Sequence, residues 1–142
     1  QCPIHPERKN LFHDYVEKHS NLLKKNGIEP ALMMTWAYKD KPEMTSQLAK
    51  EYTVAGNKNN VLVMPVGLAY ANSTKVHPEI DLYTSDRRHP SKAGTYLSAC
   101  VMYASVFQTS PVGNPYTFDL DKNSALNLQK VAWATHQEYY EN

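Results

Sequence analysis

The chain has 142 residues, of which 42% are hydrophobic, and this is enough apolar surface for one packed domain. Its 15 basic and 14 acidic residues give a net charge of +1, which provides no electrostatic attraction to nucleic acids or anionic membranes. No apolar run approaches the roughly 20 residues needed to span a bilayer. We therefore expect neither a nucleic-acid partner nor a membrane span.

A helix is predicted from Glu7 to Asn26, because Pro6 marks its start and Gly27 marks its end. Apolar residues recur within this range close to the spacing of one helix face, which indicates a helix. These residues are Leu11, Phe12, Tyr15, Val16, Leu22 and Leu23.

Two short apolar runs predict strands that are buried on both faces. The first is Ala31–Trp36 and the second is Val61–Met64, which Pro65 ends. Both are too short for a helix and carry no polar alternation, as is typical of strands in a parallel sheet.

Between the strands, Pro42 opens a predicted helix, and the polar residues 57–60 form a connection to the second strand. The helix has an apolar face formed by Met44, Leu48 and Tyr52. A short helix is predicted over Val66–Val76, with Gly67 allowing a close backbone approach at its start.

A polar loop from His77 to His89 leads into the next predicted helix. Pro90 keeps His89 out of helical geometry, and Ser91 is the expected N-cap. The buried stripe of this helix is predicted to be Tyr96, Leu97, Cys100, Val101 and Ala104. After an irregular crossing, a final helix begins at Asp121 or Asn123, with a core of Leu126, Val131 and Trp133.

The order helix, strand, helix, strand, helix, helix implies two parallel strands joined by a crossover helix. Ligands of such sheets bind beyond the carboxyl ends of the strands. Trp36, Tyr38 and Gly67 follow these ends, so they are the candidate substrate-binding residues. An aromatic residue at such a position is as often part of the core.

Asp86 and His89 are the candidate catalytic residues, because a carboxylate three residues from an imidazole can orient it as a base. In the alternative interpretation, Asp86 accepts backbone N–H groups and His89 is simply exposed. Together with His77 and Asp81 the pair offers metal-ligand types, but the spacing matches no standard zinc site. We expect no metal and no cofactor.

The remaining titratable residues suggest no second site. His5, His13, His19 and His136 are predicted to face solvent, and the pair at positions 87 and 88, both arginine, is typical of a solvated surface. Cys100 is predicted to be a small buried hydrophobe. With Cys2 it makes no disulfide framework, so the redox compartment stays open.

Several motifs in order resemble the SGNH (GDSL-type) hydrolases over nearly the whole chain from about residue 30 onward. The last conserved block of that family is similar to Asp86-x-x-His89-Pro90-Ser91, followed by Gly94-Thr95-Tyr96-Leu97 and Ser110-Pro111-Val112-Gly113. Earlier and later segments that resemble the same branch are Met34-Thr35-Trp36-Ala37, Pro65-Val66-Gly67 and Leu128-Gln129-Lys130-Val131-Ala132-Trp133.

The resemblance implies an α/β fold that is part of a three-layer α/β/α, flavodoxin-like sandwich with a parallel sheet. It implies that residues 1–142 are the C-terminal portion of a single hydrolase domain, with the N-terminal strands missing. It also implies a serine esterase or acetylesterase acting on a small-molecule or glycan ester, with His89 as base and Asp86 as its orienting partner. The same resemblance favours a secreted or periplasmic location, which the residues themselves leave unknown.

The family's nucleophile motif, Gly-Asp-Ser, occurs nowhere in the 142 residues. We therefore expect an upstream segment or a second chain to carry the serine, and we expect this chain alone to lack serine-dependent esterase activity. The alternative hypothesis is a non-catalytic ligand-binding or interaction module on the same scaffold.

Overall fold

The computed structural model describes residues 3–141 and shows a mixed α/β fold that is mostly helical. Within this range it contains five helices and one two-stranded parallel sheet. The elements are α1 (Pro6–Lys25), β1 (Ala31–Met33), α2 (Met44–Asn59), β2 (Leu62–Met64), α3 (Val66–Val76), α4 (Lys92–Phe107) and α5 (Lys122–Glu141). None of these helices combines the length and the apolar character that a membrane crossing requires.

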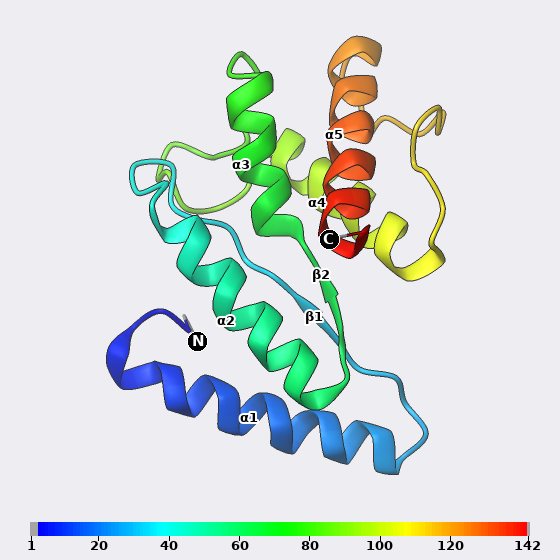
Figure 1. Cartoon of the computed structure of the whole chain (residues 1–142). Coiled ribbons are helices and arrows are strands. Elements are labelled where there is room, and N and C mark those ends of the chain that lie inside the picture. The colour runs from blue at the N-terminus through cyan, green and yellow to red at the C-terminus, as the bar shows by residue number, and fades with distance from the viewer. Residues whose placement is uncertain (1–2, 142) are drawn as a thin grey trace.

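The two strands pair in parallel, as the order of elements predicts. Ala31 pairs with Leu62, and Met33 pairs with Met64. Figure 1 shows α1 and α2 at one end of the molecule and α3, α4 and α5 at the other, with the strands running between the two ends. The carboxyl ends of both strands therefore point toward the three-helix end.

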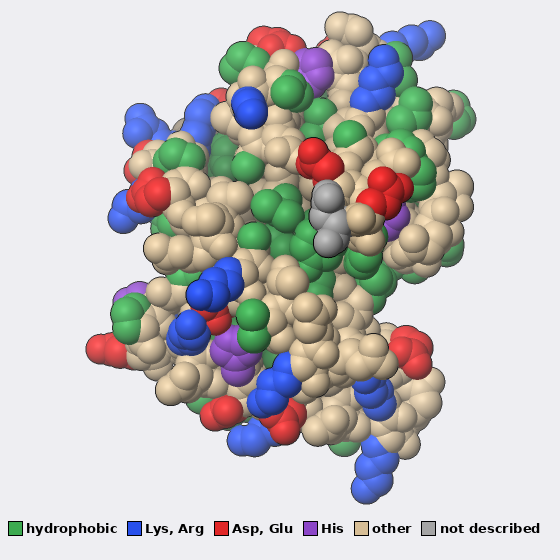
Figure 2. All heavy atoms as spheres, viewed as in Figure 1, with side chains coloured by type: hydrophobic (Ala, Val, Ile, Leu, Met, Phe, Trp, Pro, Cys, Tyr) green, Lys and Arg blue, Asp and Glu red, His purple; other side chains and the backbone are tan. Residues whose placement is uncertain are grey.

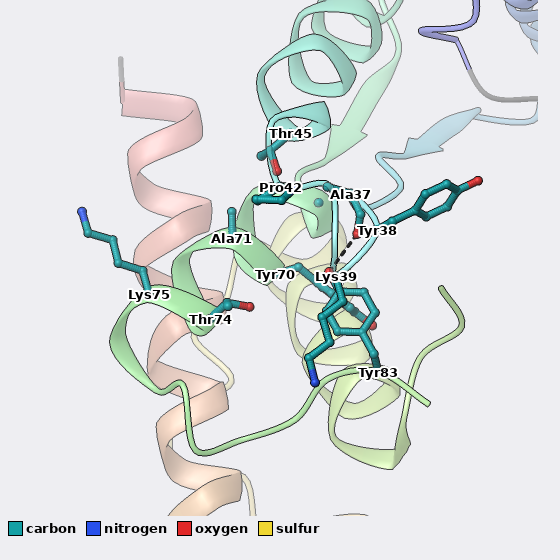
Figure 3. Close-up of a pocket in the computed structure, with 11 residues that line it drawn as sticks. Ala37, Tyr38, Lys39, Pro42, Thr45, Tyr70, Ala71, Thr74, Lys75 and Tyr83 are labelled. Carbon is teal, nitrogen blue, oxygen red and sulfur yellow. Dashed lines mark hydrogen bonds between the residues drawn. The ribbon is translucent and has the colours of Figure 1, made fainter. Parts of the chain in front are cut away.

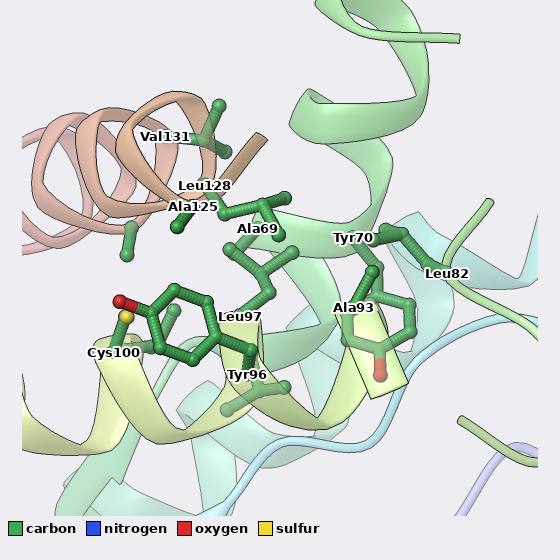
Figure 4. Packing of buried hydrophobic residues seen from close by; sticks show 13 residues of the cluster. Ala69, Tyr70, Leu82, Ala93, Tyr96, Leu97, Cys100, Ala125, Leu128 and Val131 are labelled. Atoms are coloured by element: carbon green, nitrogen blue, oxygen red, sulfur yellow. The ribbon is translucent and has the colours of Figure 1, made fainter. Parts of the chain in front are cut away.

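The main hydrophobic cluster joins α3, α4 and α5 (Figure 4). Leu97 and Leu128 are fully buried at its centre, and Tyr70 contributes its ring from α3. The predicted buried stripe of α4 is confirmed at every position: Tyr96, Leu97, Cys100, Val101 and Ala104.

A second cluster lies on the α2 side of the strands. Met34 and Val63 from the strand region pack there against Leu48 and Tyr52 of α2. Tyr139 of α5 is half-buried against the same cluster, and its hydroxyl lies 2.7 Å from that of Thr53. The C-terminal part of α5 therefore connects the two clusters.

Three predicted features of the strands and helices need correction. β1 is shorter than predicted and is exposed at Ala31 and Met33 rather than buried on both faces, because its outer edge and outer side are uncovered. α2 continues through the polar residues 57–59, which were predicted as a connection, and ends at Asn60 in a left-handed conformation with φ of 49°. Asparagine tolerates this conformation. The helix therefore includes most of the asparagine-rich run and ends at its last residue, Asn60.

Of the apolar residues that recur along α1, only Val16 is buried, and Phe12 and Leu23 are half-buried. Tyr15 is 49% exposed and Leu22 is 59% exposed. α1 contacts α2 through ion pairs such as Lys9–Glu51 and also through Phe12, whose ring centroid lies 5.1 Å from that of Tyr52. Figure 2 shows charged side chains over the α1 end of the molecule, and hydrophobic side chains gathered near the C-terminal end of α5.

The core of α5 also differs from the prediction. Val131 is buried as predicted, whereas Leu126 and Trp133 are only half-buried. The fully buried positions include Ala125, Leu128 and Ala132, because the helix turns a different face toward α3 and α4.

Candidate functional site

The loop between α3 and α4 folds back on itself and brings Asp86 into contact with His89. The N–H of Arg87 donates to the carbonyl of Thr84 at 2.9 Å, and the N–H of Thr84 donates to the carbonyl of His89 at 2.9 Å. Arg87 has a left-handed φ of 62°, which reverses the chain between the two candidate catalytic residues. As a result, Nδ1 of His89 hydrogen-bonds to Oδ2 of Asp86.

The second carboxylate oxygen of Asp86 is also fully engaged. It accepts hydrogen bonds from the backbone N–H groups of His89 at 2.9 Å and Arg88 at 2.8 Å, and from the Thr84 hydroxyl at 2.8 Å. The His89 ring first, and then these donors, hold the pKa of the Asp86 carboxyl far below its usual range. Asp86 is therefore an anion at neutral pH.

The free nitrogen of His89 faces solvent. The side chain is 80% exposed, and within residues 3–141 its Nε2 has no hydrogen-bond partner. Because Asp86 accepts at Nδ1, the neutral ring carries its proton there and leaves a lone pair on Nε2. Asp86 therefore orients the His89 ring so that Nε2 faces solvent.

The start of α4 fixes this loop in place. The Ser91 hydroxyl accepts a hydrogen bond from the N–H of Gly94 at 3.1 Å and donates to the carbonyl of Asp81 at 2.7 Å, so the predicted N-cap is confirmed. A Cβ at Gly94 would lie 2.2 Å from the carbonyl oxygen of Leu82. Gly94 therefore allows α4 to begin directly against the loop.

The segment after β1 packs against the same loop. The indole N–H of Trp36 donates to the carbonyl of Arg88 at 2.9 Å, and the N–H of Lys39 donates to the carbonyl of Arg87 at 3.0 Å. The Arg88 guanidinium lies 4.2 Å from the centre of the Tyr38 ring. The structure thus brings the predicted residues Trp36 and Tyr38 to the loop that carries Asp86 and His89.

Two cavities flank this segment. The first has a volume of ≈ 290 Å³ and lies between the segment and α3. Figure 3 shows Lys39, Tyr70 and Tyr83 together beside it, whereas the Tyr38 ring points the other way. The second has a volume of ≈ 320 Å³ and is lined by Thr35, Trp36, Tyr38, Met44, Leu48, Tyr52 and Arg88.

Gly67 lies at the first cavity, but its main contacts are with the backbone after β1. Its N–H donates to the carbonyl of Met34 at 3.0 Å, and a Cβ at this position would lie 2.2 Å from the carbonyl oxygen of Thr35. The close backbone approach predicted for Gly67 is confirmed. Its N–H is already used and is not free for a ligand.

Sequence reasoning missed two residues of this region. The Tyr83 hydroxyl donates to the carbonyl of Ala37 at 2.8 Å and so ties the loop to the segment after β1. Arg88, which was interpreted as solvated surface, packs on Tyr38 and pairs with Asp40 at 3.2 Å. Neither contact has a local signal in the sequence, because each joins segments far apart in the chain.

Other titratable residues lie elsewhere. The prediction that His13 and His136 face solvent is wrong, because His13 pairs with Glu51 at 2.8 Å and His136 is buried in α5. Cys100 is buried as predicted, and burial raises the pKa of its thiol to about 11; Cys2 lies outside the described residues.

The residues considered for a metal site do not converge. His77 pairs with Glu79 at 3.2 Å, and Asp81 pairs with Lys39 at 2.7 Å. Across residues 3–141, no three histidine, cysteine or acidic side chains are grouped so that they hold a metal ion.

Comparison with known proteins gives no relative for this chain. No family model, no curated protein and no solved structure matches it.

Proposed function

We propose that this chain supplies the acid–base part of a serine ester hydrolase of the SGNH type. The observation that carries the proposal is the ionised Asp86 bound to Nδ1 of His89, with Nε2 free and facing solvent. The resemblance of the motifs to that family supports it. The parallel pair β1 and β2 would then be the last part of a flavodoxin-like sandwich.

In this mechanism, His89 acts through Nε2. It takes the proton of a serine hydroxyl as the oxygen attacks an ester carbonyl, because the neutral hydroxyl is a poor nucleophile near pH 7. It then gives this proton to the leaving alkoxide when the tetrahedral intermediate collapses. Asp86 holds the ring in the correct tautomer and stabilises the imidazolium that forms.

The serine and the oxyanion donors come from outside the described residues, either from an upstream segment or from a second chain. The substrate is a small-molecule or glycan ester. The cavities of ≈ 290 Å³ and ≈ 320 Å³ on either side of Tyr38 support a compact substrate, and the partly exposed rings of Trp36 and Tyr38 provide apolar surface for a sugar or an acyl group.

The test uses the protein isolated with its native partner segment. We expect a fluorophosphonate probe to label a serine outside residues 1–142, located by mass spectrometry, and His89→Ala to lower kcat/KM for p-nitrophenyl acetate by about a thousandfold or more. His77→Ala is the matched control, since His77 lies near the same loop but pairs with Glu79. Labelling of a serine in this chain, or full turnover by His89→Ala, contradicts the proposal.

The second candidate function is a ligand-binding module. Two observations favour it. Nε2 of His89 meets no nucleophile in the described part of the chain, and the cavity lined by Trp36, Tyr38 and Tyr52 is formed by residues of this chain. His89→Ala separates the two functions, because a binding module keeps its affinity for a glycan ligand whereas the hydrolase loses turnover.

A further inference from the structure

Among the described residues that line the second cavity beside Tyr38, Arg88 alone carries a charge. The cavity has a volume of ≈ 320 Å³, at the lower end of the range of about 300–1,000 Å³ for small-molecule sites. Figure 3 shows the Tyr38 ring directed away from the first cavity, and Trp36, Leu48 and Tyr52 are further parts of the lining of the second. The described walls therefore combine apolar surface with one positive charge.

The guanidinium of Arg88 is held by two contacts that leave one of its edges free. It lies 4.2 Å from the centre of the Tyr38 ring, and its Nη1 donates to Oδ1 of Asp40 at 3.2 Å. Its Nε and Nη2 have no hydrogen-bond partner in the part of the chain that the structure describes. These two nitrogens form the edge whose parallel N–H groups bind both oxygens of a carboxylate.

The backbone of Arg88 joins the second cavity to the loop of the candidate site. Its carbonyl accepts the indole N–H of Trp36 at 2.9 Å, and its own N–H donates to Oδ1 of Asp86 at 2.8 Å. Asp86 in turn binds Nδ1 of His89, the next residue in the chain. The guanidinium and the imidazole are therefore mounted on one closed loop, and a ligand that binds Arg88 is anchored on the loop that carries His89.

The ligand that fits these walls has an apolar body and one carboxylate. Leu48 and Tyr52 are buried beneath the cavity and offer apolar contact to the body. Arg88 offers charge-assisted hydrogen bonds, which are stronger than bonds between neutral groups. A carboxylate suits this guanidinium better than a phosphate group, because Asp40 already lies on another edge and repels a dianion more strongly than a single charge.

We propose that the second cavity binds the carboxylate-bearing part of an ester substrate, and that the free edge of the Arg88 guanidinium selects for this charge. As a statement about the substrate, the inference rests on the function proposed above, whereas the binding of the carboxylate does not. Asp40 competes with the ligand for Arg88 and so limits the affinity.

The binding is tested on the chain itself with two probes of the same shape. 4-Acetoxybenzoate carries a carboxylate, and 4-acetoxybenzamide is its neutral counterpart. The NMR reporter is the indole N–H of Trp36, which bonds to the carbonyl of Arg88, and the indole of Trp133 on α5 is the internal control. We expect the benzoate to shift the Trp36 signal but not the Trp133 signal, with a Kd at least about tenfold lower than that of the benzamide.

Three variants assign the preference to Arg88. Arg88→Gln is expected to bind the two probes equally, whereas Arg87→Gln, the matched control, keeps the preference because Arg87 does not line the cavity. Asp40→Asn removes the competing charge and is expected to bind the benzoate about threefold more tightly. A purely structural ion pair between Asp40 and Arg88 predicts no such gain. Circular dichroism of each variant checks that the fold is kept.

Four results overturn the proposal. The first is an unchanged Trp36 signal in the wild-type chain with 4-acetoxybenzoate up to about 10 mM. The second is equal binding of the two probes by the wild-type chain, and the third is a preference for the benzoate that survives in Arg88→Gln. The fourth is weaker binding of the benzoate by Asp40→Asn.

Hydrolysis by the protein isolated with its native partner segment separates this inference from the function itself. Relative to the rates in buffer alone, we expect kcat/KM for 4-acetoxybenzoate to exceed that for 4-acetoxybenzamide by about tenfold, and Arg88→Gln to remove the difference. Hydrolysis that depends on His89 but is equal for the two esters overturns the inference and leaves the proposed function intact. Binding of the benzoate as expected, without hydrolysis that depends on His89, supports the carboxylate site and contradicts the function.

Discussion

At the scale of single residues, the site depends on which nitrogen of His89 carries the proton. Asp86 accepts at Nδ1 and is further held by the backbone N–H groups of Arg88 and His89. An anionic acceptor at Nδ1 selects the tautomer with a free Nε2, which is the nitrogen that the proposed general-base step uses.

Asp86→Asn is expected to reverse this tautomer. The amide NH₂ group of asparagine donates to Nδ1 and moves the ring proton to Nε2, so the base is lost although the geometry is kept. Long-range ¹H–¹⁵N NMR of the neutral ring measures the change directly. In the proposed hydrolase, ester hydrolysis is expected to fall about 10⁴-fold. Asp81→Asn is the control. Asp81 lies in the same loop as Asp86 but pairs with Lys39, so this variant leaves the His89 signals unchanged. Identical His89 signals in wild type and Asp86→Asn contradict this role.

The contact between Asp86 and His89 is predictable from the sequence because it is local. The spacing and the following Pro90 and Ser91 are enough to indicate a loop that ends at a helix cap. The pairing of His13 with Glu51 and the stacking of Arg88 on Tyr38 join segments far apart in the chain. Such contacts depend on how the elements pack, and no local pattern indicates them.

At the scale of the elements, Gly67 determines how closely α3 approaches the segment after β1. A methyl group at this position would meet the backbone of Thr35, with its carbonyl oxygen at 2.2 Å. Backbone atoms cannot move aside as a flexible side chain does, so the helix and the segment that carries Trp36 must separate.

We expect Gly67→Ala to lower the free energy of unfolding by about 1–3 kcal/mol, as overpacking does in well-packed cores. This is opposite to the gain expected from helix propensity, which favours alanine over glycine by about 1 kcal/mol. Urea unfolding measures the change, and the fluorescence of Trp36 reports the displacement of the segment. Ala71→Gly, on a half-buried position of the same helix, is the control: it loses helix propensity but leaves the Trp36 signal unchanged. A stabilised Gly67→Ala variant contradicts the close packing.

The elements themselves are well predicted where the chain carries strong boundary residues. Pro65 and Ser91 fix the starts of α3 and α4, which match the predicted positions. The end of α2 is not predicted correctly, because the polar residues 57–60 favour a loop. The helix instead continues through residues 57–59 and ends at Asn60, which adopts a left-handed conformation. The length of β1 is overestimated. An apolar run shows that its residues are suited to a strand, but it does not show how many of them pair with a neighbouring strand.

At the scale of the whole molecule, α5 packs against both hydrophobic clusters and so connects them. Leu128 of α5 belongs to the cluster with α3 and α4, whereas Tyr139 packs against the cluster of α2 and the strands. The hydroxyl of Tyr140 donates to the carbonyl of Val63 at 2.6 Å. The exposed residues Leu11, Tyr15 and Leu22 of α1 belong to neither cluster, and the periodicity of the sequence alone does not show how much of an apolar face is covered.

His136 lies at this junction on α5, and we expect it to make the stability of the chain depend on pH. The residue is 4% exposed, and its ring stacks on Trp133 with centroids 5.3 Å apart. Its Nδ1 is buried and has no hydrogen-bond partner among residues 3–141. Burial lowers the pKa of His136 below its ordinary value of 6.5, and the charge of Glu141 opposes this shift only in part. The folded state therefore holds the neutral ring at a pH where the unfolded state already binds a proton.

The free energy of unfolding is accordingly expected to fall as the pH drops through about 6.5 and below, until the folded-state pKa is reached. His136→Phe keeps the aromatic packing, removes the unpaired nitrogen and removes this proton uptake. We expect its urea midpoint to exceed that of the wild-type chain, and the difference to be larger at pH 5 than at pH 8. Trp133→Phe is the control, because it alters the same stack but keeps the histidine and hence the pH dependence. An equal loss of stability on acidification in the wild-type chain and His136→Phe contradicts this prediction. It would show that the His136 ring binds its proton in the folded chain as readily as in the unfolded chain.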